Sequence, residues 1–280
     1  MWWRMRIAAW CRQLKAIVRG CVVPTAVPMA VALVAAGCDR AADRLGKSQD
    51  RGDGTLPELT LPRTAEPPKI DGVLDESAWR NAGDTGPFVA PGSGKPASKS
   101  KVQARARVLY DATNLYVAFE VLDAAPASAF ARDAVDPHIW SKASGVELML
   151  APGDFTDNRD YFEVQVEVGG AVWDTRFDDY NAPVRQAKDP QDVRFGHQEW
   201  KSGIERATQR HGWGYVVELA LPFAQLKTAR TPTPPAAGSK WRMNLYTFRD
   251  GQADALAWSP ILGKGNFHRA SRFGVLRFAP

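Results

Sequence analysis

The chain has 280 residues, 45% of them hydrophobic, with 36 basic side chains, 31 acidic side chains and three cysteines. This composition excludes an intrinsically disordered chain and a disulfide-rich scaffold. Five of the basic residues and none of the acids lie in residues 1–37, so the remainder carries 31 charges of each sign and gives no electrostatic case for nucleic-acid binding.

The N-terminus predicts an exported lipoprotein. The apolar stretch Val22–Ala36 follows the basic residues, as in an export signal, and is too short to cross a bilayer of about 30 Å comfortably. The junction V-A-A-G-C at Val34–Cys38 resembles a bacterial lipobox. We therefore predict residues 1–37 as a signal peptide and Cys38 as the lipidation site, with a single membrane-spanning anchor as the alternative. Acyl chains on Cys38 would hold the protein in the cell envelope, facing the periplasm or the cell surface.

Two segments follow the leader. Residues 38–62 are polar and rich in charge and glycine, without apolar periodicity, and predict a flexible tether. Residues 63–280 are enough for a single hydrophobic core. The run K-I-D-G-V-L-D-E-S-A-W at Lys69–Trp79 opens this domain with an Asp-Gly turn and one helical turn, and we expect Trp79 to face inward.

The periodicity of the domain is mostly two. Phe162, Val164, Val166 and Val168 alternate with polar residues, which predicts a half-buried strand that ends at the turn Gly169-Gly170. Further strands are predicted by the same pattern at Val102–Tyr110, Leu115–Leu122, Val146–Leu150, Ala171–Phe177, Tyr215–Leu221, Trp241–Phe248 and Phe273–Phe278.

Strands do not alternate with long helices; only Pro222–Leu226 has a helical pattern. The predicted fold class is therefore all-β, an antiparallel β-sandwich with long loops. Three loops stand out for length, at Ala90–Lys101, Asp123–Ser144 and Thr228–Ser239, and long loops on a rigid sandwich are where binding sites are expected.

Enzyme motifs are absent: the chain has no G-x-S-x-G, H-E-x-x-H, phosphate loop or C-x-x-C, which favours a non-catalytic protein. Its four histidines have no metal-ligand spacing. The loop Gly153–Asp160 clusters oxygen atoms but does not match the EF-hand spacing, which favours an acidic turn; Asp154, Asp157 and Asp160 are weak candidates for a structural calcium site.

Seven tryptophans remain after the leader. Sugars present apolar C–H faces that stack on aromatic rings, while their hydroxyls need fixed donors and acceptors. We expect Trp79, Trp241 and Trp258 to fill the core. Trp140 differs, because it lies near the end of a long polar loop, just before the strand that starts at Val146.

Five segments in order resemble the carbohydrate-binding module family 9 over about Pro67–Pro280: K-I-D-G-V-L-D-E-S-A-W, V-L-Y-D-A-T-N-L-Y-V-A-F-E-V, W-S-K-A-S-G-V-E-L-M-L, G-W-G-Y-V-V-E-L-A-L-P-F and S-R-F-G-V-L-R-F. The resemblance implies a sandwich of the jelly-roll type, similar also to DOMON domains, that binds a poly- or oligosaccharide.

The same resemblance implies the site residues. Trp140 and Phe267 match the two rings that sandwich a terminal sugar, and Glu147 matches the carboxylate that bonds sugar hydroxyls. Glu163 and Gln165 match polar residues on a central strand of the family's site. Asn266 and His268 adjoin Phe267. The sequence departs from the family where Ser141–Gly145 replaces a segment that often holds Asp, where the second ring is Phe, and where the central strand lacks an Arg.

Two alternatives stay open at this stage. Related sandwiches carry haem b, for which Met149 with Met243, His268 or Lys264 would be the ligands. The domain could also be an interaction module that lost sugar binding, since a shared fold does not fix function. In each case we expect a monomer.

Overall fold

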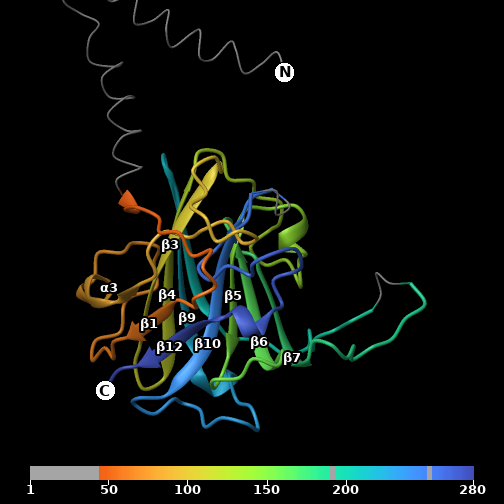
Figure 1. Ribbon diagram of the computed structural model, residues 1–280. Helices are drawn as coiled ribbons and strands as arrows, with labels where there is room; N and C mark the ends of the chain where they lie inside the picture. Colours follow the sequence, from red (N-terminus) through yellow and green to blue (C-terminus); the bar gives the residue numbers. More distant parts are fainter. Residues whose placement is uncertain (1–43, 190–192, 251–253) are drawn as a thin grey trace, which may run out of the picture. The chain divides into compact units, whose positions relative to one another are not determined.

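The computed structural model describes residues 44–189, 193–250 and 254–280; the predicted signal peptide and Cys38 lie outside them. The described strands form two sheets packed face to face (Figure 1), as predicted for a β-sandwich. Within these ranges, none of the helices has the length and apolar character needed to cross a membrane.

Sheet A has the strand order β1-β12-β10-β5-β6-β7, with β11 paired to β10. All of its pairs are antiparallel except β1 with β12, which run parallel. The strands are β1 (Glu58–Leu61), β5 (Gly145–Ala151), β6 (Arg159–Glu167), β7 (Val172–Asp179), β10 (Lys240–Phe248), β11 (Leu256–Ala257) and β12 (Gly274–Phe278).

Sheet B has the order β2-β3-β4-β9-β8 and is antiparallel throughout. Its strands are β2 (Gly83–Asp84), β3 (Val102–Tyr110), β4 (Asn114–Asp123), β8 (Glu205–His211) and β9 (Gly214–Pro222). Helical segments in the described residues are short: α3 (Ser77–Asn81), η1 (Ile139–Ser141), η3 (Phe223–Gln225) and η4 (Ala270–Arg272).

Alternation along the strands builds the core. The apolar residues of period two point between the sheets, for example Val146 and Leu148 on β5 and Val164 and Val166 on β6. Trp241 and Trp258 lie in this core, as expected, whereas Trp79 is buried in a separate cluster on the outer face of sheet B. The prediction that β6 is half-buried is wrong, however, because its polar residues are buried as well, on the outer face of sheet A.

The predicted tether is wrong for its described part. Residues 58–61 (E-L-T-L) form β1, with Leu59 and Leu61 turned into the core, and Arg277 on β12 makes a bidentate ion pair with Glu58 at 2.7 and 3.0 Å. The period-two pattern is present in this segment, but its partner strand lies more than 200 residues later in the chain.

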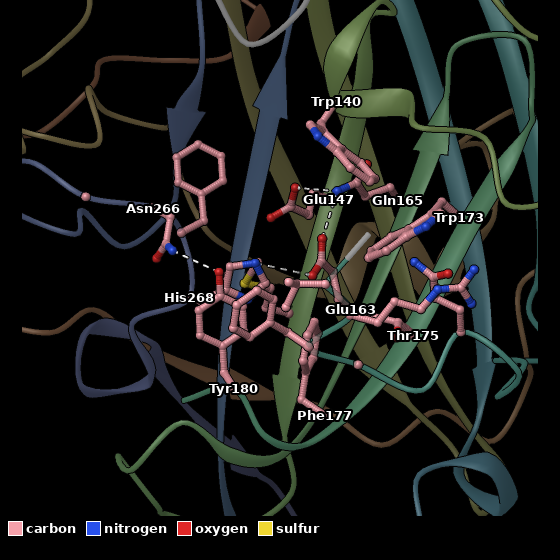
Figure 2. Close-up of a pocket in the computed structure, with 18 residues that line it drawn as sticks. Trp140, Glu147, Glu163, Gln165, Trp173, Thr175, Phe177, Tyr180, Asn266 and His268 are labelled. Atoms are coloured by element: carbon pink, nitrogen blue, oxygen red, sulfur yellow. Dashed lines mark hydrogen bonds and ion pairs between the residues drawn. The ribbon is translucent and has the colours of Figure 1, made fainter. Parts of the chain in front are cut away.

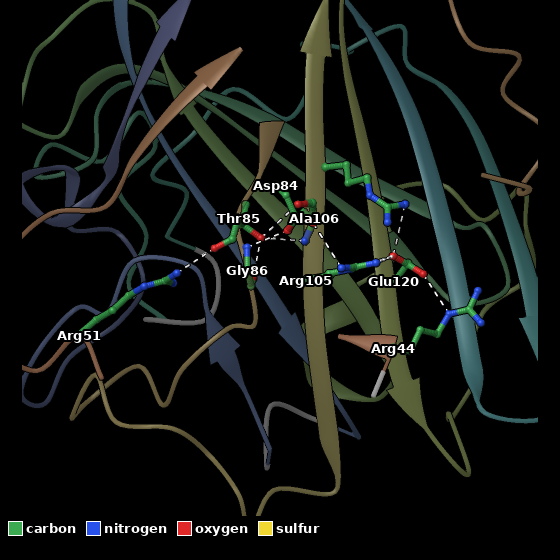
Figure 3. A network of polar contacts seen from close by, with 9 residues as sticks. Arg44, Arg51, Asp84, Thr85, Gly86, Arg105, Ala106 and Glu120 are labelled. Carbon is green, nitrogen blue, oxygen red and sulfur yellow. Dashed lines mark hydrogen bonds and ion pairs between the residues drawn. The ribbon is translucent and has the colours of Figure 1, made fainter. Parts of the chain in front are cut away.

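Arginines fix the rest of this segment to the domain (Figure 3). Arg51 donates to the carbonyl oxygens of Thr85 and Trp258, at 2.8 and 2.5 Å. Arg44 donates to Glu120 of β4 at 3.0 Å. Glu120 also pairs with Arg105 at 2.7 Å and with Arg107 at 3.5 Å, so three cations meet one buried carboxylate on the outer face of sheet B.

The K-I-D-G run also packs on the outer face of sheet B. Gly72 has φ +92°, and a Cβ there would meet Gln209, so the Asp-Gly turn needs glycine. Glu218 of β9 accepts hydrogen bonds from the backbone N–H groups of Asp71 and Gly72 and from Trp79 Nε1, the last at 2.7 Å. Trp79 points from α3 onto the outer face of sheet B and is buried there, which agrees with its predicted inward orientation.

Candidate functional site

A cavity of about 390 Å³ lies on the outer face of sheet A (Figure 2). The register of three neighbouring strands sets its floor. Glu147 of β5 lies opposite Gln165 of β6, which lies opposite Trp173 of β7. Met149, Glu163 and Thr175 form the next such row. Since side chains alternate across a strand, both rows point away from the core and into the cavity.

The floor is polar, and its side chains are largely buried. Glu147, Glu163 and Gln165 are 1%, 3% and 2% exposed. The Gln165 side-chain nitrogen donates to Glu147 at 3.0 Å and to Glu163 at 2.8 Å, so one amide joins both carboxyls. Each of the three side chains keeps one oxygen without a hydrogen-bond partner among the described residues: Glu147 Oε1, Glu163 Oε2 and Gln165 Oε1.

Burial shifts the pKa values of the titratable side chains at this floor. It raises the pKa of Glu163 to about 8. Burial and the neighbouring Glu163 raise the pKa of Glu147 well above its usual range. Burial also lowers the pKa of His268 to about 3, so its imidazole is neutral at neutral pH and offers no counter-charge, although its Nε2 lies 3.8 Å from Glu163 Oε2.

Aromatic rings form much of the wall. Trp140 packs edge-on against Trp173, with ring centroids 5.0 Å apart, and Phe177 and Tyr180 line the cavity farther along. Phe267 stacks on Tyr246, with centroids 4.0 Å apart and planes 5° from parallel, so one of its faces is already covered.

The loop before η4 is held in place over the floor. His268 Nδ1 is 2.7 Å from Tyr161 Oη, and its ring stacks on Tyr180 at 3.9 Å. Asn158 donates to the His268 carbonyl oxygen and accepts from the Ala270 N–H. Asn266 reaches the hydroxyl of Tyr180 at 2.9 Å. These bonds fix the segment that carries Phe267.

The structure brings all the predicted saccharide-site residues into this one cavity: Trp140, Glu147, Glu163, Gln165, Asn266, Phe267 and His268. Sequence reasoning missed Trp173, Thr175 and Phe177. A signal for them existed, because the turn at Gly169-Gly170 sets the register that places Trp173 beside Gln165. Tyr180 and the rim residues Val193–Gly196 had no such signal.

The expectation for the long loops holds only in part. Of the three, Asp123–Ser144 contributes Trp140, whereas no residue of Ala90–Lys101 or Thr228–Ser239 lines the cavity. Segments after β7 and before η4 form the rim instead.

The weak calcium candidates in Gly153–Asp160 do not come together as a metal site within the described residues. Each of its candidate carboxylates pairs with an arginine: Asp154 with Arg242 at 2.5 Å, and Asp157 and Asp160 with Arg230 at 3.0 and 3.6 Å. Across the described ranges, no group of three or more His, Cys, Asp or Glu side chains comes together to hold a metal ion.

The haem hypothesis loses two of its candidate ligands, Met243 and Lys264. Met149 and His268 both line the cavity, but Met243 lies in the core between the sheets, on the opposite face of sheet A. Lys264 is exposed on the loop before η4 and is not among the residues that line the cavity. No observation favours haem, and we do not propose haem binding.

The fold and the site together define a two-sheet β-sandwich with a ligand-sized cavity on one outer face. The family model described as carbohydrate family 9 binding domain-like matches residues 70–279, and the chain belongs to this family. A comparison with curated proteins finds no match.

Solved structures with 16% identity share the fold. A putative carbohydrate-binding protein from Bacteroides uniformis has a TM-score of 0.60 and covers 80% of this chain and 100% of its own. A family 9 carbohydrate-binding module from Caldicellulosiruptor kristjanssonii has TM-scores of 0.50 in complex with cellotriose and 0.51 in complex with glucose. These two structures cover 79% of this chain and 93% and 95% of their own. At this identity the likeness shows the fold alone.

Proposed function

We propose that this protein binds carbohydrate, without catalysis, in the cavity on the outer face of sheet A. One observation carries the proposal: residues from four separate parts of the sequence meet there and combine aromatic rings with buried, unpartnered polar atoms. The family membership supports it, as do the structural neighbours that hold glucose and cellotriose.

In this proposal the rings of Trp140 and Phe267 pack against the apolar faces of a sugar, and Glu147, Glu163 and Gln165 bond its hydroxyls. A buried polar atom without a partner costs about 1–3 kcal/mol, and a ligand that supplies the missing partner recovers that cost. We expect dissociation constants of about micromolar to millimolar, which correspond to about 8 to 4 kcal/mol of binding free energy.

Calorimetric titration with glucose and cello-oligosaccharides tests this function. Trp140→Ala is expected to weaken binding about tenfold or more, because it removes an aromatic wall. Trp213→Ala is the matched control, since Trp213 lies at the β8–β9 turn of sheet B and not in the cavity. Unchanged affinity in the Trp140 variant would refute the site, and failure of a broad glycan panel to bind the parent protein would refute the function.

We further propose that Cys38 is lipidated and anchors the domain in the cell envelope, as a monomer facing the periplasm or the cell surface. The basic leader and the V-A-A-G-C junction support this. Incorporation of a labelled fatty acid into the parent protein, lost in Cys38→Ala, is the expected result. Label retained by the variant would contradict the assignment.

A further inference from the structure

We infer that the cavity selects saccharides that carry a free, protonated amino group. The inference rests on the proposed function and names the class of ligand. Its basis is the floor of the cavity, where Glu147, Glu163 and Gln165 converge from two neighbouring strands (Figure 2).

When the two carboxyls are ionised, the unpartnered atoms of these three residues are all acceptors. The Gln165 amide nitrogen is taken up by the two carboxyls, and within the described residues one oxygen on each of the three side chains has no donor. An ammonium group has three N–H donors and no acceptor, whereas a sugar hydroxyl has a single O–H donor. Three converging acceptors therefore match the donors of one ammonium group better than those of one hydroxyl.

The two floor carboxyls also lack a cation. Among the residues that the structure describes, no Lys or Arg lies within ion-pair distance of Glu163 or Glu147. The nearest basic group is His268, and burial lowers its pKa to about 3, which leaves it neutral. Arg194, the one Lys or Arg among the described lining residues, is exposed at the rim.

Burial without a counter-charge raises the pKa values of both carboxyls, that of Glu163 to about 8. A cation that enters the cavity favours their charged forms, so binding of an ammonium group releases protons from the floor near neutral pH. The other titratable groups that surround the pair are Tyr161, Tyr180, Tyr246, His268 and Arg194. The tyrosine pKa values are raised and that of His268 is lowered, so all four stay neutral at neutral pH. Arg194 is the remaining basic side chain of this set and lies at the rim.

The aromatic walls of the cavity also fit a saccharide that carries a protonated amino group. Trp140, Trp173, Phe177 and Tyr180 present aromatic surface to the cavity. Such rings pack against the C–H face of a sugar, and their negative faces also attract a cation within about 6 Å. An acetylated amine lacks the charge and two of the three donors, so it does not satisfy the floor.

Calorimetric titration with D-glucosamine, D-glucose and N-acetyl-D-glucosamine at pH 7 tests the inference. We expect glucosamine to bind at least tenfold more tightly than either of the other two. In buffers of different ionisation enthalpy, its binding heat should report net proton release, and that of glucose should not. Glucose binding as tightly as glucosamine would overturn the inference and leave the proposed function standing; no binding of any of the three would overturn the inference and count against the proposed function.

Single substitutions test whether the floor carboxyls cause the preference for glucosamine over glucose. Glu163→Gln is expected to reduce the glucosamine-to-glucose affinity ratio to about threefold or less, and Glu147→Gln provides an independent second variant should the first not fold. Glu205→Gln is the control, since Glu205 begins β8 on the other sheet and the ratio should stay at its parent value. A ratio of tenfold or more in both floor variants would refute the role of the floor.

Discussion

Glu120 and Glu163 are two glutamates of equal burial, each 3% exposed, on the outer faces of the two sheets. Burial tends to raise the pKa of Glu120, but Arg105, Arg107 and Arg44 more than offset it and lower the pKa overall. Beside Glu163 lie the Gln165 amide, a neutral imidazole and the second carboxyl, Glu147, and burial raises the pKa of Glu163 to about 8. The protein itself supplies counter-charges for Glu120. For Glu163 no described residue does so, and a ligand would have to supply one.

A contrast in hydrogen bonding runs across both faces, although burial also raises the pKa of Glu218 on sheet B to about 7. On sheet B, Glu218 is satisfied by the Asp71–Gly72 turn and Trp79, as Glu120 is by its arginines. On sheet A, Glu147 and Glu163 keep unpartnered oxygens. Buried polar groups that destabilise the free protein are typical of binding sites, where activity and stability are in conflict. Sheet B therefore carries structural carboxylates, and sheet A carries the candidate site.

The largest expected effect is on the pH dependence of stability at Glu163. Its folded pKa of about 8 exceeds the ordinary value of 4.5, so the folded state favours the protonated form. Its contribution to stability is full below pH 4.5 and is lost as the pH rises towards 8. From pH 5 to pH 9, the parent protein should lose on the order of 3 kcal/mol in urea unfolding, since one pKa unit corresponds to about 1.4 kcal/mol. Glu163→Gln should flatten this loss; equal slopes in the two proteins would contradict the comparison.

Glu120→Gln, by contrast, should destabilise the folded protein at neutral pH. Three arginines lose a charged partner, and hydrogen bonds to charged groups contribute about 1.5–3 kcal/mol, so we expect a loss of about 2 kcal/mol. The lowered pKa of Glu120 places its contribution above pH 4.5, and it is lost as the pH falls below that value. Urea unfolding at pH 7 and pH 4 measures both effects. If Glu120→Gln is as stable as the parent at pH 7, Glu120 does not stabilise the folded state, and its contrast with Glu163 is wrong.

The smallest expected effect is at Arg44, whose side chain is 44% exposed. It pairs with Glu120 and lies over the Trp213 ring at 4.3 Å. Exposed pairs contribute about 0.2–1 kcal/mol, so Arg44→Ala should cost about 0.5 kcal/mol and make residues 44–57 easier to cleave in limited proteolysis. The control is Arg210→Ala on the same sheet. Equal proteolysis of both variants would indicate that the Arg44 pair does not hold the segment.

Much of the fold could be predicted from the sequence. The period-two strands β3–β7, β9, β10 and β12 carry enough apolar alternation to be identified without a partner. β8 (E-R-A-T-Q-R-H) could not be predicted in this way, because it is an edge strand whose side chains are mostly exposed and show no alternation. β1 was missed because a four-residue strand is decided by its distant partner β12.

By itself the sequence determined the alternation and the turn at Gly169-Gly170, and these place Glu163 and Gln165 on the face opposite the core. Only the tertiary structure decided the environment of that face, because local pattern carries no information on what packs over a strand. The loop holding His268 and the rings of Trp140 and Trp173 line the cavity above the floor, whose polar side chains are 1–3% exposed. Likewise, only the fold brings Arg44 to Glu120, 76 residues along the chain, and leaves Glu163 without such a partner.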